Sequence, residues 1–252
     1  MRILVSDIDG TIFRNKKISR KDLESIIEFQ KEHILILATG RSYYNFSRVS
    51  DLYSLPYKYC ILNNGSLIVD KFDNIVKEKT FPAIIVTDIY NAISKGPIEF
   101  ALSISFSLSG VYYSNVSMIS LENILQDIPI EISGMSITLP LGTINDYIDL
   151  KKHLYKLKSI NVETNGRYVD ILPKGVSKSV AAQFISKKLS VENDSIAVIG
   201  DSYNDISMFK YFKNSYVIKE SEENVKKYAK KEVGNIAACI TDFIKWIYMY
   251  IE

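Results

Sequence analysis

Apolar residues in the first part of the chain occur in short runs that are separated by amphipathic segments. Apolar runs that begin at Ile3, Ile34 and Tyr59 predict buried strands. Between them, residues 20–32 carry apolar residues at helical spacing, and residues 42–52 suggest another helix. This alternation of strands and helices favours a parallel sheet with right-handed crossovers.

The pattern changes at Pro82, after a segment at 67–79 that predicts a hairpin. The elements expected beyond Pro82 are a helix at 83–95, strands at 98–105, 110–113 and 131–139, a helix at 143–157, and strands at 160–164 and 167–172. None of these strands ends in acidic residues, and their hairpin-like spacing favours an α+β unit. We therefore expect an inserted domain at 82–172, bounded by Pro82 and Pro173.

The first pattern resumes after Pro173. The elements expected here are an amphipathic helix at 177–189, strands at 195–200 and 216–218, a charged helix at about 221–231 and a final helix at 235–251. We therefore expect the α/β class, in which residues 1–81 and 173–252 together form one discontinuous domain around a parallel sheet.

Charge and cysteine content exclude several classes of protein. The 252 residues include 31 basic and 29 acidic residues, a formal net charge of +2 that gives no reason to expect nucleic acid or a membrane surface as partner. Cys60 and Cys239 lie in apolar surroundings without a CxxC pair, which indicates buried thiols in a reducing compartment. No signal peptide follows Met1, and the apolar stretch 243–251, interrupted by Lys245, is too short to span a bilayer. We expect a soluble cytoplasmic protein.

The first candidate chemistry follows the first strand, in the sequence Asp7-Ile8-Asp9-Gly10-Thr11. Side chains alternate along a strand, so Asp7 and Asp9 would project to the same side if the strand remained regular. Two such carboxylates repel each other unless a cation lies between them, and a divalent cation with oxygen ligands is the simplest candidate. The alternative is an ordinary Asp-Gly turn with solvated acids.

A second acidic cluster, Asp201 and Asp205, follows the strand predicted at 195–200. The carboxyl ends of parallel strands meet at one edge of a sheet, where open α/β proteins bind their ligands. Two strands that deliver carboxylates to this edge are what a magnesium site needs.

Further polar residues follow other strands or begin helices. A hydroxyl, a glycine amide and a guanidinium in Thr39-Gly40-Arg41 could contact phosphate, although the triplet also suits a plain strand-to-helix turn. Asn64 lies in an Asn-Gly segment that indicates a turn first and a polar site second. Lys178 falls in the first turn of the 177–189 helix, where the dipole disfavours a cation, so the side chain either meets an anion or extends into water.

Two common nucleotide-binding classes are excluded. The chain has no Walker A loop, and no GxGxxG follows the first strand. The two histidines, His33 and His153, lie far from both acidic clusters in the sequence, which argues against a histidine-based mechanism.

The order and spacing of the motifs resemble those of the haloacid dehalogenase superfamily of phosphotransferases. The match comprises DxDGT at 7–11, TGR at 39–41, the lysine of a VSK segment at 178 and GDxxND at 200–205. The inserted segment resembles the cap of the Cof-type phosphatases, near sugar-phosphate phosphatases and eukaryotic phosphomannomutases. The resemblance covers nearly the whole chain and implies a Rossmann-like three-layer core with an inserted α+β cap.

Two positions depart from the pattern of that family. Ser179 stands where the family usually has glycine, and Lys219-Glu220 stands where many members have Gly-Asn. Neither change removes a catalytic group, but the second leaves the family's substrate-loop contacts unassigned in this chain.

The resemblance implies a role for each acidic residue. Asp7 attacks phosphorus and forms an aspartyl-phosphate, while Asp9 protonates the leaving oxygen and then activates water. Mg²⁺ is held by the Asp7 carboxylate, the Asp9 carbonyl and Asp201, and Asp205 lies in or near the same coordination shell. The cation offsets the repulsion between a carboxylate and a phosphate. The residues implied in holding the phosphoryl group are Thr39, Gly40, Lys178 and Asn204, and those at the pocket edge are Arg41 and Asn64.

Three hypotheses about function remain open. The first is a Mg²⁺-dependent phosphatase of small phosphomonoesters, such as sugar phosphates or related metabolites. The second is a phosphomutase that uses the same chemistry, and the third is a non-catalytic regulatory protein. The expected partner is a small phosphorylated metabolite, and the chain is expected as a monomer or homodimer. The insert would set the substrate, and its residues match no motif that identifies one.

Overall fold

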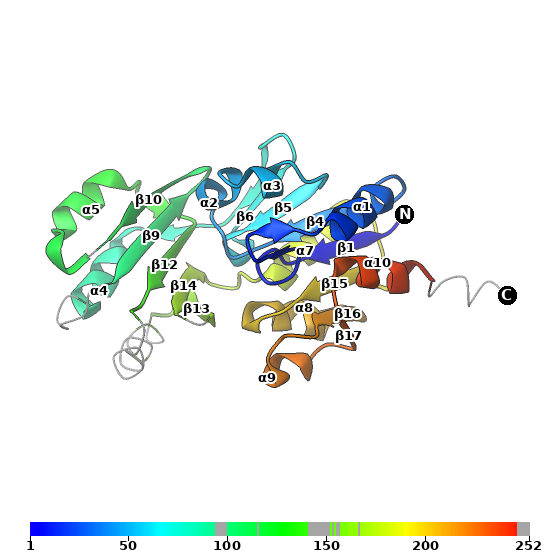
Figure 1. Cartoon of the computed structure of the whole chain (residues 1–252). Coiled ribbons are helices and arrows are strands. Elements are labelled where there is room, and N and C mark those ends of the chain that lie inside the picture. The colour runs from blue at the N-terminus through cyan, green and yellow to red at the C-terminus, as the bar shows by residue number, and fades with distance from the viewer. Residues whose placement is uncertain are drawn as a thin grey trace.

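The computed structural model describes residues 1–93, 100–114, 116–140, 152, 154, 157–165 and 167–245. Two sheets organise these residues, a large one on the right of Figure 1 and a smaller one on the left. None of the helices within the described ranges has the length and apolar character needed to cross a bilayer. Cys60 and Cys239 are buried and unpaired, as expected.

The large sheet has eight strands in the order β17-β16-β15-β1-β4-β5-β6-β7. Their bounds are β1 (Ile3–Ser6), β4 (Ile34–Ala38), β5 (Tyr59–Leu62), β6 (Leu67–Asp70), β7 (Ile75–Glu78), β15 (Ile196–Gly200), β16 (Asn214–Ile218) and β17 (Lys231–Val233). The strands from β17 to β5 are parallel, and β6 and β7 form the antiparallel hairpin. Because β1 pairs with β4 on one side and β15 on the other, the motif-bearing strand ends lie next to one another.

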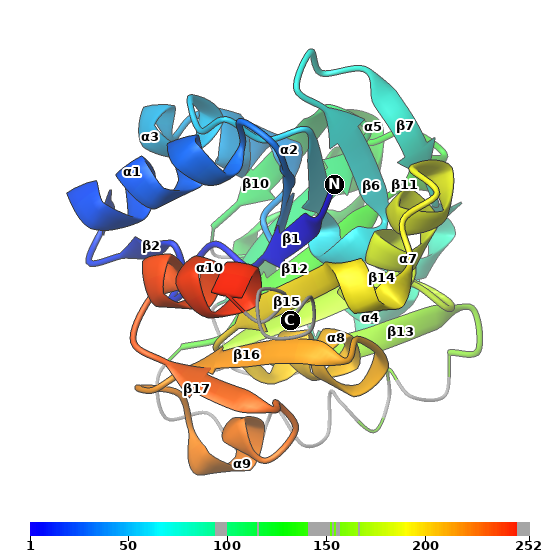
Figure 2. The ribbon, with the colours of Figure 1, turned by 90° about the vertical axis from the view of Figure 1, so that its right-hand side faces the viewer.

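Helices cover both faces of this sheet. Figure 2 shows α1 (Arg20–Phe29) and α10 (Ile236–Lys245) on one face, with α7 (Lys178–Lys188) and α8 (Ile206–Tyr211) on the other. Adjacent residues of β1 point to opposite faces, so Leu4 packs with the first pair of helices and Ile3 with the second. The predicted α/β class with a three-layer, Rossmann-like core is therefore confirmed.

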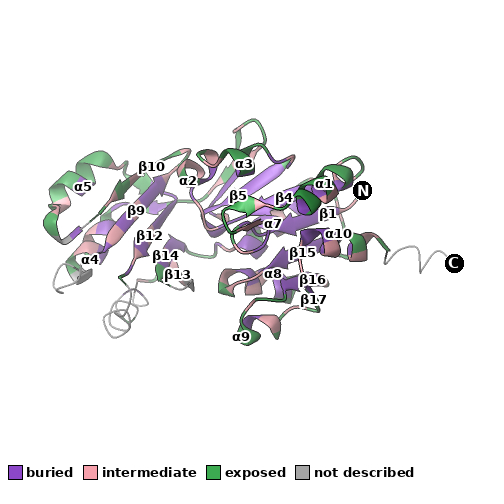
Figure 3. Ribbon diagram, in the orientation of Figure 1, coloured by how far each residue is buried: buried purple, intermediate pink, exposed green. Residues whose placement is uncertain are grey.

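The smaller sheet is antiparallel, with five strands in the order β10-β9-β12-β14-β13. Their bounds are β9 (Ala101–Phe106), β10 (Ser109–Tyr113), β12 (Gly134–Thr138), β13 (Ile160–Asn165) and β14 (Tyr168–Pro173). Helices α4 (Ile84–Ile93) and α5 (Leu121–Asp127) pack on one face of this sheet, as Ile89, Ile124 and Ile104 show by sharing one buried cluster. Buried ribbon accordingly runs along both sheets in Figure 3, while much of α5 is exposed.

The remaining elements are short. They are β2 (Phe13–Arg14), β3 (Lys17–Ile18), β8 (Phe81–Pro82), β11 (Glu131–Ile132), α2 (Tyr43–Ser47), α3 (Ser50–Tyr53), α9 (Glu223–Lys226) and the 3₁₀ turns η1 (Asn63–Gly65), η2 (Val116–Met118), η3 (Asn193–Ser195) and η4 (Tyr203–Asp205). The two-stranded pairs are β2 with β3 and β8 with β11.

Several predicted elements differ from the observed ones. The helix expected at 42–52 is two helices, because Val49 between α2 and α3 has an extended backbone. The strand expected at 131–139 breaks at buried Ser133, whose amide donates to the Ser105 carbonyl, so that β11 and β12 join different sheets. The helix expected at 221–231 is only α9, since Lys231 begins an edge strand beside β16. The sequence reading also missed α5.

Two predicted helices reach beyond the described residues. The helix at 143–157 falls almost wholly outside them, and the final helix is described only as far as Lys245.

Candidate active site

The chain turns sharply where β1 ends at Ser6. The Asp7 amide donates to the Ile199 carbonyl of β15, and the amides of Thr11 and Phe13 both donate to the Ile8 carbonyl. The strand therefore does not continue regularly through Asp9, and the two acids enter different surroundings. Asp7 is buried, whereas Asp9 is exposed.

Gly10 allows the second acidic loop to approach this turn. Its φ is +89°, a conformation that favours glycine, and a Cβ placed there would lie 2.2 Å from Asp201 Oδ2. Thr11 Oγ1 donates to Asp201 Oδ1 at 2.7 Å, which fixes the orientation of that carboxylate. The DxDGT segment thus both contributes an acid and positions one from the other strand.

Three acids from the two loops form one cluster. Carboxylate oxygens of Asp7, Asp201 and Asp205 lie within 4.8 Å of one another. The second oxygen of Asp205 accepts from the backbone amides of Asp201 at 3.0 Å and Ser202 at 3.1 Å, so the loop is organised around that side chain. The sequence prediction that both strand ends converge is confirmed.

Lys178 reaches this cluster from the first turn of α7. Its side chain is fully buried, and Nζ donates to Asp7 Oδ1 at 2.6 Å and to Asp205 Oδ1 at 2.7 Å. Burial lowers the pKa of Lys178, but the attraction of Asp205 and Asp7 outweighs this effect and raises the pKa above its usual range. The lysine therefore meets an anion, the first of the two outcomes that its position allowed.

The cluster has the composition of a hard-cation site. One ammonium faces three carboxylates, and Asp7 Oδ2 is buried with no hydrogen-bond partner among the described residues. Burial raises the pKa of Asp7, and burial together with the Asp205 charge raises that of Asp201 to about 6. A divalent cation with oxygen ligands would compensate this excess of negative charge, so the residues fit Mg²⁺.

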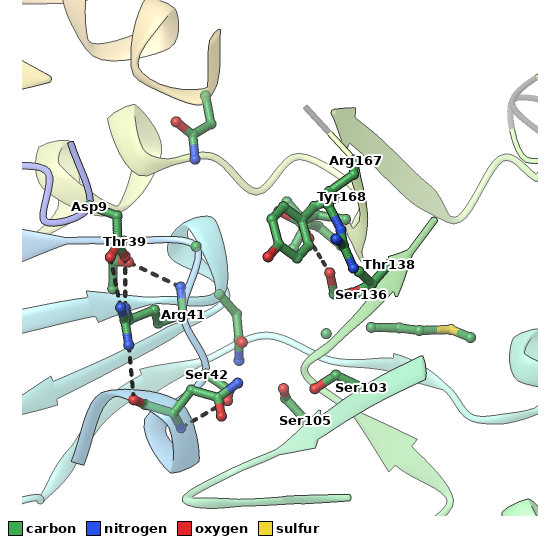
Figure 4. A pocket seen from close by; sticks show the side chains of 18 of the residues that line it. Asp9, Thr39, Arg41, Ser42, Ser103, Ser105, Ser136, Thr138, Arg167 and Tyr168 are labelled. Atoms are coloured by element: carbon green, nitrogen blue, oxygen red, sulfur yellow. Dashed lines mark hydrogen bonds and ion pairs between the residues drawn. The ribbon is translucent and has the colours of Figure 1, made fainter. Parts of the chain in front are cut away.

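The Asp9 carboxylate faces Arg41 instead. Arg41 Nε donates to Asp9 Oδ2 and Arg41 Nη2 to Asp9 Oδ1, both at 2.7 Å, in a bidentate pair (Figure 4). The Arg41 backbone amide donates to Thr39 Oγ1 at 3.1 Å, which orders the turn of the TGR segment. The two acids of the first motif therefore have separate partners.

Asn64 connects the TGR loop to the second acidic loop. It is fully buried and has a φ of +50°, and its Oδ1 accepts from Asn204 Nδ2 at 3.0 Å. A Cβ placed on Gly40 would lie 3.3 Å from Asn64 Oδ1, so the amide packs closely over the glycine. Asn64 Nδ2 donates to Asp170 Oδ2 of β14 at 2.9 Å, across to the smaller sheet.

A cavity of about 660 Å³ lies between the edge of the large sheet and the polar face of the smaller one. Predicted site residues that line it are Asp7, Asp9, Thr39, Gly40, Arg41 and Asn204. Lys178, Asp201, Asp205 and Asn64 lie behind this lining and support it through the hydrogen bonds described above. Figure 4 shows Asp9, Thr39 and Arg41 on one wall and Ser136, Thr138, Arg167 and Tyr168 on the other.

The residues on the second wall were missed by the sequence reading. They include Ser103, Ser105, Ser136, Thr138, Arg167, Tyr168 and Asp170. Along β14, Val169 and Ile171 enter the hydrophobic cluster while Tyr168 and Asp170 face the cavity. This period-two pattern was visible in the sequence, but it also fits a sheet face that simply meets water.

Comparison with known proteins identifies the family of this chain. The model of the haloacid dehalogenase-like hydrolases matches residues 4–238. The chain belongs to that family. This confirms the resemblance that the four motifs indicated, and it makes the protein a hydrolase.

Individual relatives span nearly the same length. A protein of Mycoplasma capricolum, named only as uncharacterized, is 31% identical over 93% of this chain and 97% of its own length. The 5-amino-6-(5-phospho-D-ribitylamino)uracil phosphatase YcsE of Bacillus subtilis is 21% identical over 83% of this chain and 80% of its own. The solved structure of the subclass IIB sugar phosphatase BT4131 superposes with a TM-score of 0.74 and 17% identity, covering 100% and 99% of the two chains. At that identity the likeness shows the shared fold.

Proposed function

We propose that the protein is a Mg²⁺-dependent phosphatase that hydrolyses small phosphomonoesters, sugar phosphates or related metabolites, through an aspartyl-phosphate intermediate. The observation that carries the proposal is Asp7, a buried carboxylate at the cavity wall with one oxygen bonded to Lys178 and the other unpartnered among the described residues. Family membership and the phosphatase relatives support the same reaction.

Asp7 is the proposed nucleophile. Lys178 fixes Oδ1, which leaves Oδ2 available to attack phosphorus. A bond forms between this oxygen and phosphorus while the ester oxygen departs with its electron pair. Water then cleaves the aspartyl-phosphate, releasing phosphate and regenerating the carboxylate.

Mg²⁺ would be held by the carboxylates of Asp7, Asp201 and Asp205 and by the Asp9 carbonyl. When bound, the cation offsets the repulsion between the attacking carboxylate and the phosphate dianion. Thr11 supports this arrangement by holding the Asp201 carboxylate in place.

The phosphoryl group would rest against Thr39, the Gly40 amide and Lys178. A lysine ammonium has three donors, and two of those of Lys178 are engaged by Asp7 and Asp205, so one remains for a phosphoryl oxygen. These donors stabilise the charge that shifts to the equatorial oxygens in the transition state. Asn204 and Asn64, which bond each other, would hold the Gly40 side of this pocket in shape.

Asp9 is the proposed proton-transfer group. It would protonate the leaving oxygen in the first step and accept a proton from the attacking water in the second. Arg41 keeps its carboxylate at the cavity wall in the meantime.

Residues 82–172 are proposed to act as a cap over a catalytic core formed by 1–81 and 173–252. The polar face of the five-stranded sheet would close over Asp7, exclude water from the first step and contact the leaving group.

We propose a cytoplasmic location for the protein, where the buried thiols of Cys60 and Cys239 would stay reduced.

The test is phosphate release from a panel of phosphorylated metabolites with Mg²⁺, comparing the wild type with Asp7→Asn. We expect turnover of at least one polyol or sugar phosphate and a loss of at least about 10³-fold in Asp7→Asn, with an unchanged circular dichroism spectrum. Asp194→Asn, at an exposed acid paired with Lys213, serves as the matched control. Near-normal turnover in folded Asp7→Asn would disprove the nucleophile, and no release by the wild type from any ester would disprove the function.

A further inference from the structure

The wall opposite Asp7 carries a row of polar residues across the five-stranded sheet. Tyr112 pairs with Ser103, Ser103 with Ser136, Ser136 with Asp170, and Asp170 with Glu163. Of the described residues of this sheet that line the cavity, Asp170 alone has a carboxylate. A leaving group that enters the cavity therefore meets mostly hydroxyl groups and a single fixed acid.

Asp170 is held from both sides of the cavity. Its Oδ1 accepts from Ser136 Oγ at 2.7 Å within the cap, and its Oδ2 accepts from Asn64 Nδ2 at 2.9 Å in the core. Burial raises the pKa of Asp170 above its usual value, and these two donors and the Lys178 charge offset only part of that rise. A carboxylate offers about four acceptor positions, which leaves room for donors from a ligand.

The carboxylate also lies close to the proposed phosphoryl site. Asn64, which donates to Asp170, packs over Gly40, and the Gly40 amide is a proposed phosphate donor. A phosphomonoester seated at Asp7 would thus bring the nearest atoms of its leaving group toward Asp170.

Two of the cations at the cavity are already engaged by carboxylates. Lys178 is buried and bonded to Asp7 and Asp205. Arg41 is engaged by Asp9, and Arg167 is exposed, with its guanidinium 5.9 Å from the centre of the Tyr168 ring. An anionic group beside Asp170 would therefore meet the like charge of that carboxylate, and among the described lining residues Arg167 is the cation that could offset the repulsion.

We propose that Asp170 is a specificity-determining residue that selects leaving groups with hydrogen-bond donors, hydroxyl or ammonium, and rejects those with a carboxylate or second phosphate beside it. The inference rests on the proposed phosphatase function, because it assumes that the phosphoryl group lies at Asp7. A like charge at contact distance in a partly desolvated cavity should weaken binding by about tenfold or more. A hydroxyl or ammonium group would instead fill the remaining acceptor positions of Asp170.

Binding to an inactive variant tests the selection independently of turnover. In an Asp7→Asn background with Mg²⁺, titration calorimetry would compare polyol phosphates with the aldonic acid phosphates of the same length. The pairs are glycerol 3-phosphate with 3-phosphoglycerate, erythritol 4-phosphate with 4-phosphoerythronate, and sorbitol 6-phosphate with 6-phosphogluconate. We expect at least one pair to favour the polyol by about tenfold or more. Phosphoethanolamine against 2-hydroxyethyl phosphate distinguishes an ammonium donor from a hydroxyl donor.

The Asp170→Asn substitution, added to that background, removes the charge while its amide can still bond Asn64 and Ser136. We expect it to reduce the ratio of polyol affinity to acid affinity in that pair by about tenfold. Asp127→Asn is the matched control, because this cap acid bonds Tyr113 and does not line the cavity. Its ratio should equal that of the parent.

Several results would overturn the inference. One is an Asp170→Asn ratio equal to the parent's, including the case in which both ligands weaken equally, as a purely structural role would produce. Another is tighter binding of the acid than of the polyol. The inference would also fail if the Arg167→Ala substitution abolished the preference for the polyol while Asp170→Asn retained it. A third is that no ligand binds the Asp7→Asn protein. Selective binding without turnover in the wild type would instead count against the phosphatase function alone.

Discussion

Asp9 and Asp7 are separated by one residue, yet they differ in burial and in partner. Asp7 is buried against Lys178, whereas Asp9 is exposed and paired with Arg41. Substitution of Asp7 and substitution of Asp9 should therefore reduce turnover in different ways. Asp7 would supply the atom that bonds to phosphorus, so no neighbour can replace it, whereas Asp9 would move protons, a role that contributes about 10²–10⁴-fold in enzymes.

We expect Asp9→Ala to reduce turnover much more for alkyl phosphates than for aryl phosphates. An aryl leaving anion is stable and barely needs an acid, whereas an alkoxide does need one. The second step uses the same group as base for every ester, so phosphoenzyme should accumulate with an aryl substrate in a rapid-quench experiment. Mg²⁺ affinity would be measured alongside, because the Asp9 carbonyl is a proposed ligand. Equal losses on both esters, with metal bound and no covalent intermediate, would exclude proton transfer by Asp9.

At the scale of single residues, the sequence predicted the acidic cluster better than the opposite wall of the cavity. Asp7 and Asp201 follow strands, and the carboxyl ends of neighbouring parallel strands must meet, so their convergence could be deduced. No comparable rule predicts the positions of Asp170 and Arg167. Asp170 lies on β14 of an antiparallel sheet and Arg167 in the turn before that strand. Only the position of that sheet over the core decides whether its polar face meets solvent or substrate.

At the scale of elements, the hairpin of β13 and β14 carries an acid that the fold does not satisfy. Glu163 on β13 lies beside Asp170, and its buried Oε2 has no hydrogen-bond partner among the described residues. Burial raises the pKa of Glu163 to about 7, although the Lys178 charge opposes this. The folded protein therefore prefers the neutral acid, so the stability that Glu163 contributes is full below about pH 4.3 and is lost as pH rises through about 7.

We expect Glu163→Gln to remove this pH dependence. Its free energy of unfolding should exceed that of the wild type by about 1–3 kcal/mol at pH 8 and by less at pH 5, and the two values should converge below about pH 4.3, where Glu163 is neutral in both the folded and the unfolded state. Thermal unfolding of both proteins between pH 5 and 8 measures the difference. Glu131→Gln, at an exposed acid of β11, should follow the wild type throughout. A constant difference from pH 5 to 8 would show that Glu163 does not titrate as described.

Elements with a clear local pattern were predicted well, and those decided by distant partners were not. The runs at β1, β4 and β5 are apolar on both faces because helices cover both sides of a parallel sheet. The segment at 231–233 looks like the end of a charged helix, yet it pairs with β16 at the sheet edge. Pairing between strands far apart in sequence outweighed local helix propensity there.

At the scale of the whole molecule, the candidate site joins three separate parts of the chain. Asp7 comes from the first strand, Lys178 from the helix that follows the inserted segment, and Asp201 from a later strand. These residues are brought together only in the folded protein, so a metal bound there should stabilise the entire core and not a single loop. The excess of carboxylates over cations also means that the folded protein without metal stores electrostatic repulsion.

We therefore expect Mg²⁺ to raise the midpoint of thermal unfolding. A ligand that binds only the native state adds about 2.7 kcal/mol at one hundred times its dissociation constant. The gain should grow between pH 5 and 7.5, because Asp201 must lose its proton to bind the cation and its pKa is raised to about 6 by burial and Asp205. Asp201→Ala should abolish most of the gain, whereas Asp194→Ala, at an exposed acid, should keep it. An equal gain in both variants would place the cation elsewhere, and no gain in the wild type at any pH would contradict the metal site.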